Sequence, residues 1–303
     1  KGDDNEDVEI AGRYNSMVEY DAGLSVEPLR LSIHELDWIN DHRSIPSLPT
    51  AGVADIFRTF IKHPRLRDDR QDFEVSGGVD LKASEATALV RDSAGRDLDL
   101  RIIQGRDIGV LEALSPTINP SGSTSLFDDG HNQPFIAYRQ IARPDDSRTM
   151  IATVCAPSFI TKETSYYLLI NDPSPKRLLP LAGFLGSRVF DWYVRCYVDL
   201  RILPSLITEF PVPLLIQGAR GVESLRRGAA GLIAGELLLR DWVGETQPNG
   251  DSRDNLLALL DAAAAQLVGL DLEQVGRLLA SFHRNWDHAD HLARVKEVWS
   301  TIT

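Results

Sequence analysis

The sequence predicts a mixed α/β (α+β) fold in which a mixed sheet is followed by a helical C-terminal bundle. Two apolar runs, 135–142 and 148–155, flank a Pro-Asp-Asp-Ser stretch, which is typical of a β-hairpin and its turn. Residues 178–198 repeat apolar side chains at helical spacing and predict one amphipathic helix. Residues 219–303 alternate capping signals with apolar periods, which favours a group of helices.

The N-terminal part begins with a loose, polar lead-in over residues 1–28. Ser32 then predicts a helix start, because Glu35 follows three residues later and completes a capping box. Apolar residues at helical spacing predict a second helix over 50–62, which ends before a proline. Shorter apolar runs broken by glycines predict strands at 73–75, 87–91 and 98–104.

The C-terminal helices carry clear boundaries. The first runs over 254–268 and ends at Gly269, a residue suited to the position after a helix. Asp271 caps the next helix, and Gln274 completes its capping box. A last helix is predicted over 287–299. We therefore expect an acidic lead-in over 1–28, a central domain over 29–218 and a helical region over 219–303.

Composition bounds the class of protein. The chain has 303 residues, of which 43% are hydrophobic, so it can bury a sizeable core. No apolar run approaches the ~18 residues that a membrane-spanning helix needs. The two cysteines, Cys155 and Cys196, lie far apart in apolar runs and indicate neither a disulfide framework nor a zinc site. This pattern predicts a cytoplasmic protein.

The charge is unevenly distributed along the chain. The formal net charge of −12 argues against general affinity for nucleic acid, which depends on Lys and Arg meeting phosphates. Residues 137–232, however, hold 12 Lys and Arg against 8 Asp and Glu. The flanks are acidic, with 14 against 25 over residues 1–136 and 6 against 11 over residues 233–303. A DNA-facing core between acidic flanks is consistent with this distribution.

Two segments carry a family resemblance. Residues 135–157 read Phe-Ile-Ala-Tyr-Arg-Gln-Ile-Ala-Arg-Pro-Asp-Asp-Ser-Arg-Thr-Met-Ile-Ala-Thr-Val-Cys-Ala-Pro. Residues 181–195 read Leu-Ala-Gly-Phe-Leu-Gly-Ser-Arg-Val-Phe-Asp-Trp-Tyr-Val-Arg and run on to a Pro-Val-Pro at 211–213. Together they resemble the target-recognition region of DNA adenine-N6 methyltransferases of the type IIG and phage-defence (BREX- and DISARM-like) kind. Looser matches at 31–40, 100–108 and 259–271 follow the same order as in that family.

The resemblance implies a function in restriction-modification or phage defence. The chain would read double-stranded DNA for a methyltransferase catalytic domain or subunit, and S-adenosylmethionine would belong to that partner. The chain begins with Lys1 rather than Met, which fits either a trimmed start or a fragment of a longer polypeptide. We expect a fragment, because the resemblance belongs to the C-terminal part of a longer enzyme.

Catalytic signatures are poor in this sequence. An adenine methyltransferase needs an Asn/Asp-Pro-Pro-Tyr/Phe motif to hold the flipped base, and the nearest match is Asn-Pro-Ser-Gly at 119–122. The Phe-Leu-Gly-Ser-Arg run at 184–188 lacks the second glycine of a cofactor loop. Asp80-Leu-Lys82 matches only a fragment of a nuclease motif. We therefore assign no catalytic residue to this chain.

One cluster has the composition of a metal site. His283, His288 and His291 lie close in sequence with Asp287 and Asp290. Two of the histidines, three residues apart on a helix, could meet one ion. The favoured interpretation is a polar helix start, in which the aspartates favour the first turn and the histidines are exposed. No metal ligand is assigned.

The candidate DNA-binding residues begin in the predicted hairpin. Arginine suits both phosphate and guanine because its planar fork matches either pair of acceptors. Strand alternation places Arg139 on the side of Phe135, so its guanidinium either pairs internally, for example with an aspartate, or contacts DNA. Arg143 lies beside the turn, and Arg148 and Thr149 begin the next strand, where a backbone phosphate is in reach.

Further candidates lie in loops between the matched segments, where specificity is expected to vary within such a family. They are Gln104, Arg106, Lys162, Lys176 and Arg177. Each could contact a groove or be an ordinary solvated side chain. Within 181–195, Asp191 and Arg195 are expected to support the helix as an i, i+4 pair, and its aromatic residues are expected to pack.

Two other functions remain open. A protein–protein module of the same ancestry, which docks methyltransferase or defence partners without reading DNA, is favoured by the acidic flanks. A small-molecule enzyme would have only the histidine cluster in its support. Salt-dependent binding to duplex DNA separates a DNA reader from a docking module, and metal content tests the third possibility.

Overall fold

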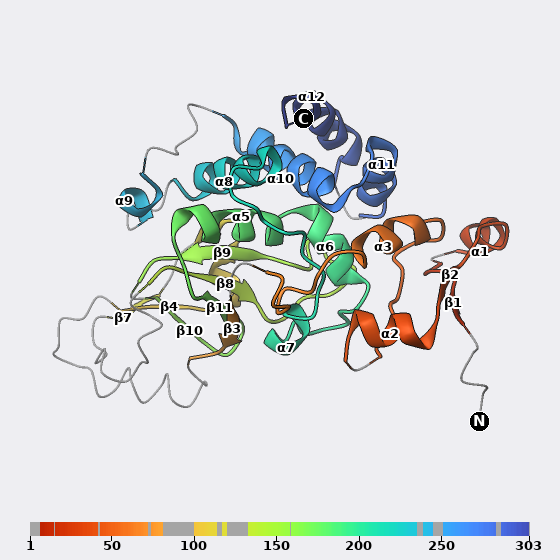
Figure 1. Cartoon of the computed structure of the whole chain (residues 1–303), viewed down its shortest axis with the longest axis horizontal. Coiled ribbons are helices and arrows are strands. Elements are labelled where there is room, and N and C mark those ends of the chain that lie inside the picture. The colour runs from red at the N-terminus through yellow and green to blue at the C-terminus, as the bar shows by residue number, and fades with distance from the viewer. Residues whose placement is uncertain are drawn as a thin grey trace.

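A computed structural model provides the fold of this chain. It describes residues 7–14, 16–41, 43–71, 74–80, 100–113, 117–119, 133–157, 159–234, 239–244, 251–282 and 286–302. The N-terminal part is a small unit beside the main body (Figure 1). Strand β1 (Val8–Ile10) pairs antiparallel with β2 (Leu29–Leu31), and α1 (Met17–Gly23) lies between them in sequence. Helices α2 (Ile33–Ile39) and α3 (Ala54–Phe60) then lead toward the main body.

The central sheet has four antiparallel strands in the order β3-β11-β8-β9. Their bounds are Val75–Gly78, Ser165–Ile170, Phe135–Arg139 and Ala152–Cys155. All four residues of β9 are buried, as are the first four of β8, because helices cover this part of the sheet. These two strands are the predicted hairpin, and the register Phe135↔Cys155 confirms the pairing.

A second sheet lies beside the first. Its strands are β10 (Phe159–Thr161), β4 (Leu100–Ile103) and β7 (Thr117–Asn119), with β4 in the middle. Strand β10 runs parallel to β4, and β7 runs antiparallel to it, so the fold contains a mixed sheet. A 3-10 turn, η1 (Gly105–Asp107), connects β4 to the short pair β5 (Ile108–Gly109) and β6 (Glu112–Ala113).

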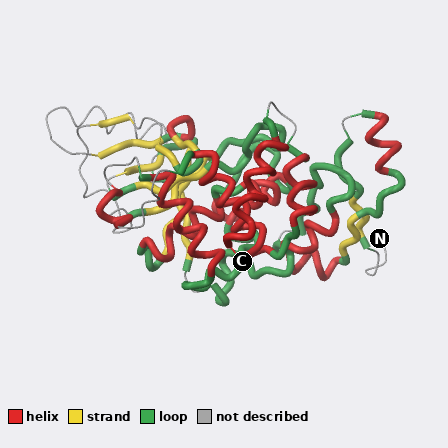
Figure 2. The backbone as a smooth tube through the Cα atoms, turned by 90° about the horizontal axis from the view of Figure 1, so that it is seen from above, coloured by secondary structure: helices red, strands yellow, loops and turns green. Residues whose placement is uncertain are grey.

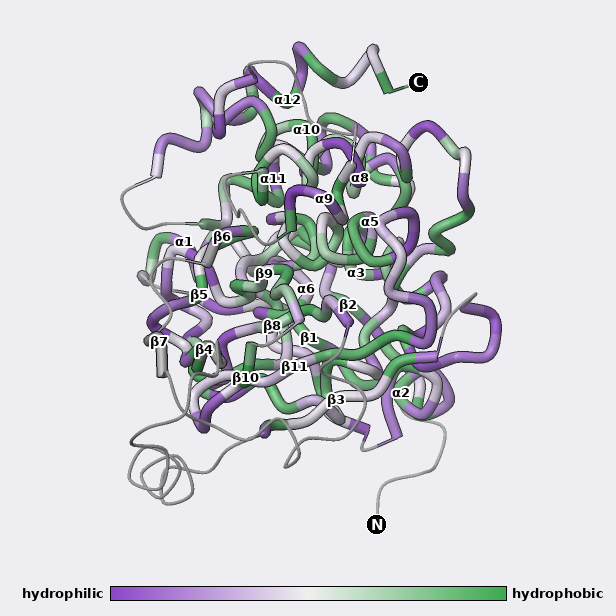
Figure 3. The backbone as a smooth tube through the Cα atoms, turned by 90° about the vertical axis from the view of Figure 1, so that its left-hand side faces the viewer, coloured by the Kyte–Doolittle hydropathy of each residue, from purple (hydrophilic) through white to green (hydrophobic). Residues whose placement is uncertain are grey.

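Helices form a layer over one face of the central sheet (Figures 1 and 2). Helix α5 (Pro175–Leu185) packs on β9 and β8, and its residues from Leu178 to Leu185 are buried. Helix α8 (Arg220–Ile233) packs against both α5 and α10 (Arg253–Val268). Figure 3 shows hydrophobic segments gathered around α5 and β9, where this layer meets the sheet. The core therefore lies between the helical layer and the sheet.

The remaining helices complete the molecule. Helix α6 (Arg188–Arg195) follows α5 directly, and α7 (Pro204–Ile207) packs near β3. The short α9 (Arg240–Val243) precedes α10, and α11 (Leu272–Ala280) and α12 (His288–Ile302) close the chain. Helix α12 packs on α10 and α11, so the C-terminal part is a helical bundle, as predicted.

The capping signals predicted helix starts well. Ser32 caps α2 and Asp271 caps α11, and both capping boxes are formed. Gly269 ends α10 with φ of 90°, a left-handed conformation that glycine adopts without steric cost. Helix α12 begins and ends within a few residues of its predicted bounds. The predicted helix over 50–62 is shorter in the structure, where α3 covers Ala54–Phe60.

Three predictions need correction. The lead-in over 1–28 is not wholly loose, since it contains β1 and α1. The helix predicted over 178–198 is two helices, because Ser187 leaves the helical conformation and its Oγ accepts from the Phe190 backbone N–H, which caps α6. The run at 73–75 is displaced to β3, and the predicted strand at 87–91 lies outside the described residues.

No helix in the described ranges is both long enough and apolar enough to cross a membrane. Cys155 and Cys196 are buried free thiols. Burial raises the pKa of the Cys196 thiol, which is therefore protonated and unreactive at neutral pH.

Candidate nucleic-acid interface

The two segments that carry the family resemblance meet at Asp191. Its side chain lies on α6, is fully buried, and faces the loop that joins β8 to β9. Its Oδ1 accepts two backbone N–H groups, from Thr149 at 2.9 Å and from Met150 at 2.8 Å. The carboxylate therefore fixes the end of this loop to the helix by two charge-assisted hydrogen bonds.

Two buried arginines hold the rest of the same loop. Arg195, which is 4% exposed, donates from its guanidinium to the backbone carbonyls of Pro144 at 3.1 Å and Asp146 at 2.6 Å. Its Nη2 also lies 3.7 Å from Asp191 Oδ2, which confirms the predicted i, i+4 pair. Arg148 donates to the carbonyl of Gly186 at 3.0 Å, at the junction of α5 and α6. The loop is thus bound to the helical layer at several points.

The charged network continues into the C-terminal bundle. Asp261 on α10 accepts the backbone N–H of Arg188 through Oδ1 at 2.6 Å, and its Oδ2 lies 2.7 Å from His291 Nε2. Burial alone would raise the pKa of the Asp261 carboxyl, but the hydrogen bond with His291 and nearby positive charges lower it overall. The Arg188 guanidinium stacks over Trp286, with 3.6 Å to the ring centroid.

Burial also changes Arg188 itself. Desolvation, together with the nearby positive charge of Arg148, lowers the pKa of Arg188 to about 9. The Arg188 guanidinium is thus held against its aromatic neighbour inside the protein. We therefore treat Arg188 as a structural cation rather than as a contact for DNA.

The predicted hairpin cations have three different environments. Arg139 is half-buried, and its Nε donates to the carbonyl of Ile108 at 2.8 Å. Its internal partner is thus a backbone carbonyl instead of the suggested aspartate. Arg143 is exposed on the loop, and its backbone N–H donates to Asp146 Oδ2 at 3.2 Å. Among the hairpin cations, Arg143 is the one whose guanidinium is turned to solvent.

Arg148 and Thr149 are buried, which corrects their predicted place beside a phosphate. Arg148 is 8% exposed and Thr149 has no exposed surface. The Thr149 hydroxyl donates to the carbonyl of Arg143 at 2.9 Å. Both residues help to bind the loop to the helices, because their polar groups form hydrogen bonds within the protein.

A second group of candidates meets at one edge of the sheets. Strand β10 lies beside β4, and the Lys162 backbone N–H donates to the carbonyl of Ile103 at 3.0 Å, which brings Lys162 next to Gln104. Arg106 follows in η1, with 77% of its side chain exposed, 3.6 Å from the Asp107 carboxylate. Arg139 lies close by, because its partner Ile108 follows η1. Along this edge Arg106 is exposed, while Lys162 and Arg139 are half-buried.

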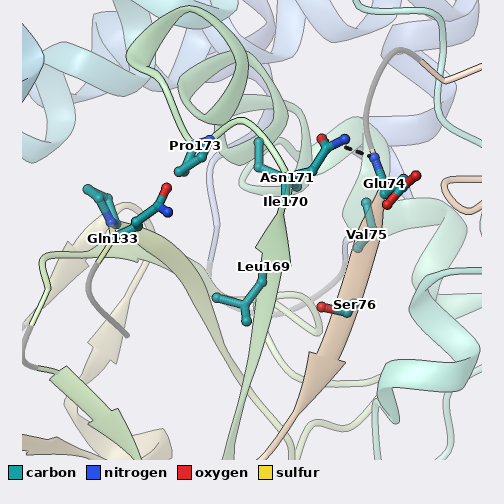
Figure 4. Close-up of a pocket in the computed structure, with 9 residues that line it drawn as sticks. Glu74, Val75, Ser76, Gln133, Leu169, Ile170, Asn171 and Pro173 are labelled. Atoms are coloured by element: carbon teal, nitrogen blue, oxygen red, sulfur yellow. Dashed lines mark hydrogen bonds between the residues drawn. The ribbon is translucent and has the colours of Figure 1, made fainter. Parts of the chain in front are cut away.

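Lys176 and Arg177 lie at the other end of β11. Arg177 is paired with Asp172 at 2.9 Å, and Lys176 is exposed in the first turn of α5. Beside this turn is a pocket of about 320 Å³, lined by residues from β3, β11 and the start of β8 (Figure 4). They are Glu74, Val75, Ser76, Gln133, Pro134, Leu169, Ile170, Asn171 and Pro173.

The lining of this pocket combines polar and apolar side chains. Asn171 Oδ1 accepts the backbone N–H of Glu74 at 3.2 Å, which holds the amide at the rim. The lining includes one carboxylate, Glu74, and one hydroxyl side chain, Ser76.

Sequence reasoning overlooked two exposed residues near the hairpin. Ile141, which is 49% exposed, pairs across an antiparallel bridge with Arg201, which is also exposed. Arg201 is the one charged residue between Leu200 and Ile207 in a mainly apolar stretch. An isolated charge in an apolar stretch could have marked Arg201 as a surface residue. Nothing in the neighbouring sequence, however, predicts that it lies beside the hairpin.

The two described histidines of the cluster lie in different environments. His291 is 7% exposed and bonded to Asp261, so the expectation of an exposed side chain is wrong for this residue. His288 is exposed, as expected, and His283 lies outside the described residues. No group of three potential ligands that could hold a metal ion was found among the residues that the structure describes.

The cofactor-loop candidate also does not fit its chemistry. Gly186 and Ser187 are buried at the α5–α6 junction, where the Gly186 carbonyl accepts from Arg148 and the Ser187 hydroxyl donates to Phe184. This turn has no open backbone to receive S-adenosylmethionine. The Asn-Pro-Ser-Gly match lies mostly outside the described residues.

Comparisons with known proteins matched this chain to solved structures only. No protein-family model matches the sequence, and no curated protein matches it. A solved structure of the type IIL restriction-modification enzyme MmeI in complex with DNA aligns with a TM-score of 0.41 and 11% sequence identity. The alignment covers 100% of this chain and 42% of that one, so the chain spans less than half the length of the enzyme.

Proposed function

We propose that this chain recognises DNA sequence for an adenine-N6 DNA methyltransferase of restriction-modification or phage defence, whose catalytic domain lies outside these residues. The observation that supports the proposal is that the two segments with the family resemblance are held together by buried hydrogen bonds. Asp191, Arg195 and Arg148 bind the loop of the first segment to the helices of the second. The same loop presents Arg143 to solvent.

Rigidity of this kind suits sequence recognition. A side chain that reads a base must be held within a fraction of an ångström by its supporting residues. Here the support is buried and charge-assisted, while Arg143 is exposed. The cations Arg106 and Lys162 on the neighbouring edge are placed to meet phosphates and fix the register on the duplex.

The proposed mechanism is a division of labour. This chain binds the duplex and sets its position through phosphate and base contacts. The partner domain then receives the target adenine and supplies the methyl donor. The proposal assigns no described group to the chemistry on the adenine, and the buried Asp191, Asp261 and His291 are hydrogen-bonded to one another or to the backbone.

A docking module is the alternative function, and one observation favours it. Helix α1 leaves large apolar side chains in solvent, with Met17 71%, Val18 79% and Leu24 66% exposed. An apolar face of this kind suits contact with another protein surface. A chain that only docks partners would bind duplex DNA neither selectively nor with the salt dependence of phosphate contacts.

Selection of duplexes from a randomised DNA pool by the purified chain, at two salt concentrations, tests the proposal. We expect enrichment of one short motif and weaker binding at the higher salt. A variant lacking the two edge cations, Arg106→Ala with Lys162→Ala, should bind all duplexes less tightly while keeping the same motif. Absence of any enriched motif together with salt-independent binding would favour the docking module.

A further inference from the structure

A short two-stranded ribbon forms where the end of β8 meets the segment after α6. Ile141 and Arg201 form an antiparallel bridge. The Ala142 N–H donates to the Leu200 carbonyl at 3.0 Å, and the Ile202 N–H donates to the Gln140 carbonyl at 2.8 Å. These bonds flank the pair, so Ile141 and Arg201 are a non-hydrogen-bonded pair whose side chains lie close together on one face.

The two faces of this ribbon differ sharply in burial. On the inner face, Gln140 is 8%, Ala142 5% and Ile202 0% exposed. On the outer face, Ile141 is 49% exposed and Arg201 is exposed across from it. Arg143 is exposed two residues beyond Ile141, which by strand alternation is the same face. An apolar side chain thus lies between two arginines.

Among the residues that the structure describes, these two arginine side chains have no partner. Neither guanidinium makes an ion pair or hydrogen bond with a residue in the described ranges, although the protein has 44 acidic against 32 basic residues. Two acids close to them in sequence have other contacts. Asp146 accepts the backbone N–H of Arg143 at 3.2 Å, and Asp199 lies 3.8 Å from Arg13. Both arginines are therefore available to an external acceptor.

The ribbon is held in place from both sides. The Gln140 N–H donates to the Thr164 carbonyl at 3.0 Å, which fixes one strand to the turn before β11. Arg195 binds the carbonyls of Pro144 and Asp146 just beyond Arg143. The segment after α6 is fixed through the Cys196 carbonyl, which accepts from the Ser47 N–H. The outer face therefore presents its three side chains from a fixed backbone.

We propose that Ile141, Arg143 and Arg201 are base-reading residues that enter the DNA major groove as a two-stranded ribbon. The major groove is wide enough for such a ribbon, and an arginine fork fits the O6 and N7 acceptors of guanine. The 5-methyl group of thymine is the apolar feature of this groove, and Ile141 provides its counterpart. The proposal rests on the function proposed above and names which residues carry specificity.

The close pairing of Ile141 and Arg201 constrains the target. Paired side chains of this type have Cβ atoms about 4.5–5.5 Å apart, and neighbouring base pairs are about 3.4 Å apart. The two side chains therefore address the same or adjacent base pairs. We expect the motif selected by this chain to contain a guanine within one step of a thymine.

The test uses the whole chain and the motif that it selects, with base analogues at single positions. Uracil in place of the thymine removes only the methyl group, and 7-deazaguanine in place of guanine removes the N7 acceptor. We expect the first change to weaken binding of the unaltered chain about fourfold, from the transfer energy of one methyl group. We expect the second to weaken it at least fivefold, from the loss of a bidentate contact.

Variants then assign each base to a residue. Ile141→Ala should bind the thymine and uracil duplexes equally, and Arg143→Ala or Arg201→Ala should lose the discrimination at guanine. Ile216→Ala and Arg227→Ala are matched controls, because Ile216 is 65% exposed and Arg227 is exposed on α8, away from the ribbon. The controls should keep both discriminations.

The outcomes separate this inference from the proposed function. If the chain selects a motif but the ribbon variants keep every base preference, the ribbon does not read bases, and the proposed function stands. Uniformly weaker binding by the arginine variants, with unchanged preference, would equally overturn the inference, because it shows phosphate contacts. If the unaltered chain selects no motif, both proposals fail.

Discussion

Asp191 Oδ1 accepts the backbone N–H groups of both Thr149 and Met150, at 2.9 and 2.8 Å. The carboxylate lies on α6 and the two amides end the β8–β9 loop, 42 and 41 residues earlier in the sequence. One acid thus replaces the strand partner that these amides lack. The contact explains why an aspartate is accommodated without exposure inside a helix whose other residues are mainly apolar.

Asp191→Ala should destabilise the protein strongly. The change leaves two buried N–H groups without an acceptor, at about 1–3 kcal/mol each, and leaves the buried Arg195 without its carboxylate. We expect the free energy of unfolding, measured with urea, to fall by about 3–5 kcal/mol. Asp191→Asn, which keeps an acceptor oxygen, should fall by less.

The control for this prediction is Asp199→Ala. The Asp199 side chain is 95% exposed, so its removal should change the free energy of unfolding by less than about 0.5 kcal/mol. Equal stability of the Asp191→Ala and Asp199→Ala variants would show that the loop does not depend on this contact.

The Asp261–His291 pair predicts a pH dependence of stability. Despite its burial, the folded pKa of Asp261 is below the ordinary 3.8, because the hydrogen bond with His291 favours the ionised form. Between the folded pKa and 3.8 the unfolded state binds the proton more readily, so stability rises with pH there. The contribution of Asp261 is fully present above about pH 4 and is lost as the pH falls through the folded pKa.

Unfolding of the unaltered chain and of Asp261→Asn over a range of pH measures this contribution. The difference in free energy of unfolding should be about 1.5–3 kcal/mol at neutral pH, as for a hydrogen bond to a charged group, and should shrink below pH 3.8. A difference that stays constant down to the acid limit would contradict the lowered pKa.

The sequence predicted the features that depend on neighbouring residues. The capping boxes at Ser32 and Asp271 and the helix end at Gly269 are each set within a few positions of the chain, and all three are present. The hairpin was predictable for the same reason, since its strands and turn are adjacent in sequence.

Features set by distant partners were not predictable in this way. The sequence around Arg148 is typical of an exposed strand start. In the structure Arg148 is buried, and it donates a hydrogen bond to the Gly186 carbonyl, 38 residues away. The break between α5 and α6 could not be seen in the sequence, because apolar residues at helical spacing continue on both sides of Ser187. The capping hydrogen bond of Ser187 is local, but the surrounding pattern is that of a continuous helix. Ile141 and Arg201 become neighbours only when the chain returns after α6.

Gly183→Ala should loosen the contact between α5 and α8. A Cβ at Gly183 would lie 2.9 Å from the Leu225 carbonyl oxygen, a backbone atom that cannot move independently of α8. We expect a loss of about 1–3 kcal/mol in the free energy of unfolding, as for overpacking a well-packed core. Thermal unfolding followed by circular dichroism would measure it.

Gly276→Ala is the matched substitution. Gly276 lies within α11, and its Cβ would meet only Leu292 Cδ2 at 3.4 Å, an ordinary contact. Alanine should here be neutral or stabilising by up to about 1 kcal/mol, because it favours the helix. If both variants lose stability equally, a general intolerance of alanine, and not the α5–α8 contact, is responsible.

Arg148→Ala and Arg106→Ala should separate stability from DNA binding. Arg148 is buried on the Gly186 carbonyl, so its loss leaves an unsatisfied acceptor and should cost about 1–3 kcal/mol in unfolding free energy. The slope of DNA affinity against salt should be unchanged, since Arg148 reaches no phosphate. Arg106, with 77% of its side chain exposed, should show the reverse, with stability unchanged and the salt slope smaller by about one. A stable Arg148→Ala variant with a reduced salt slope would instead place Arg148 on the DNA backbone, and the loop would then have to open when DNA binds.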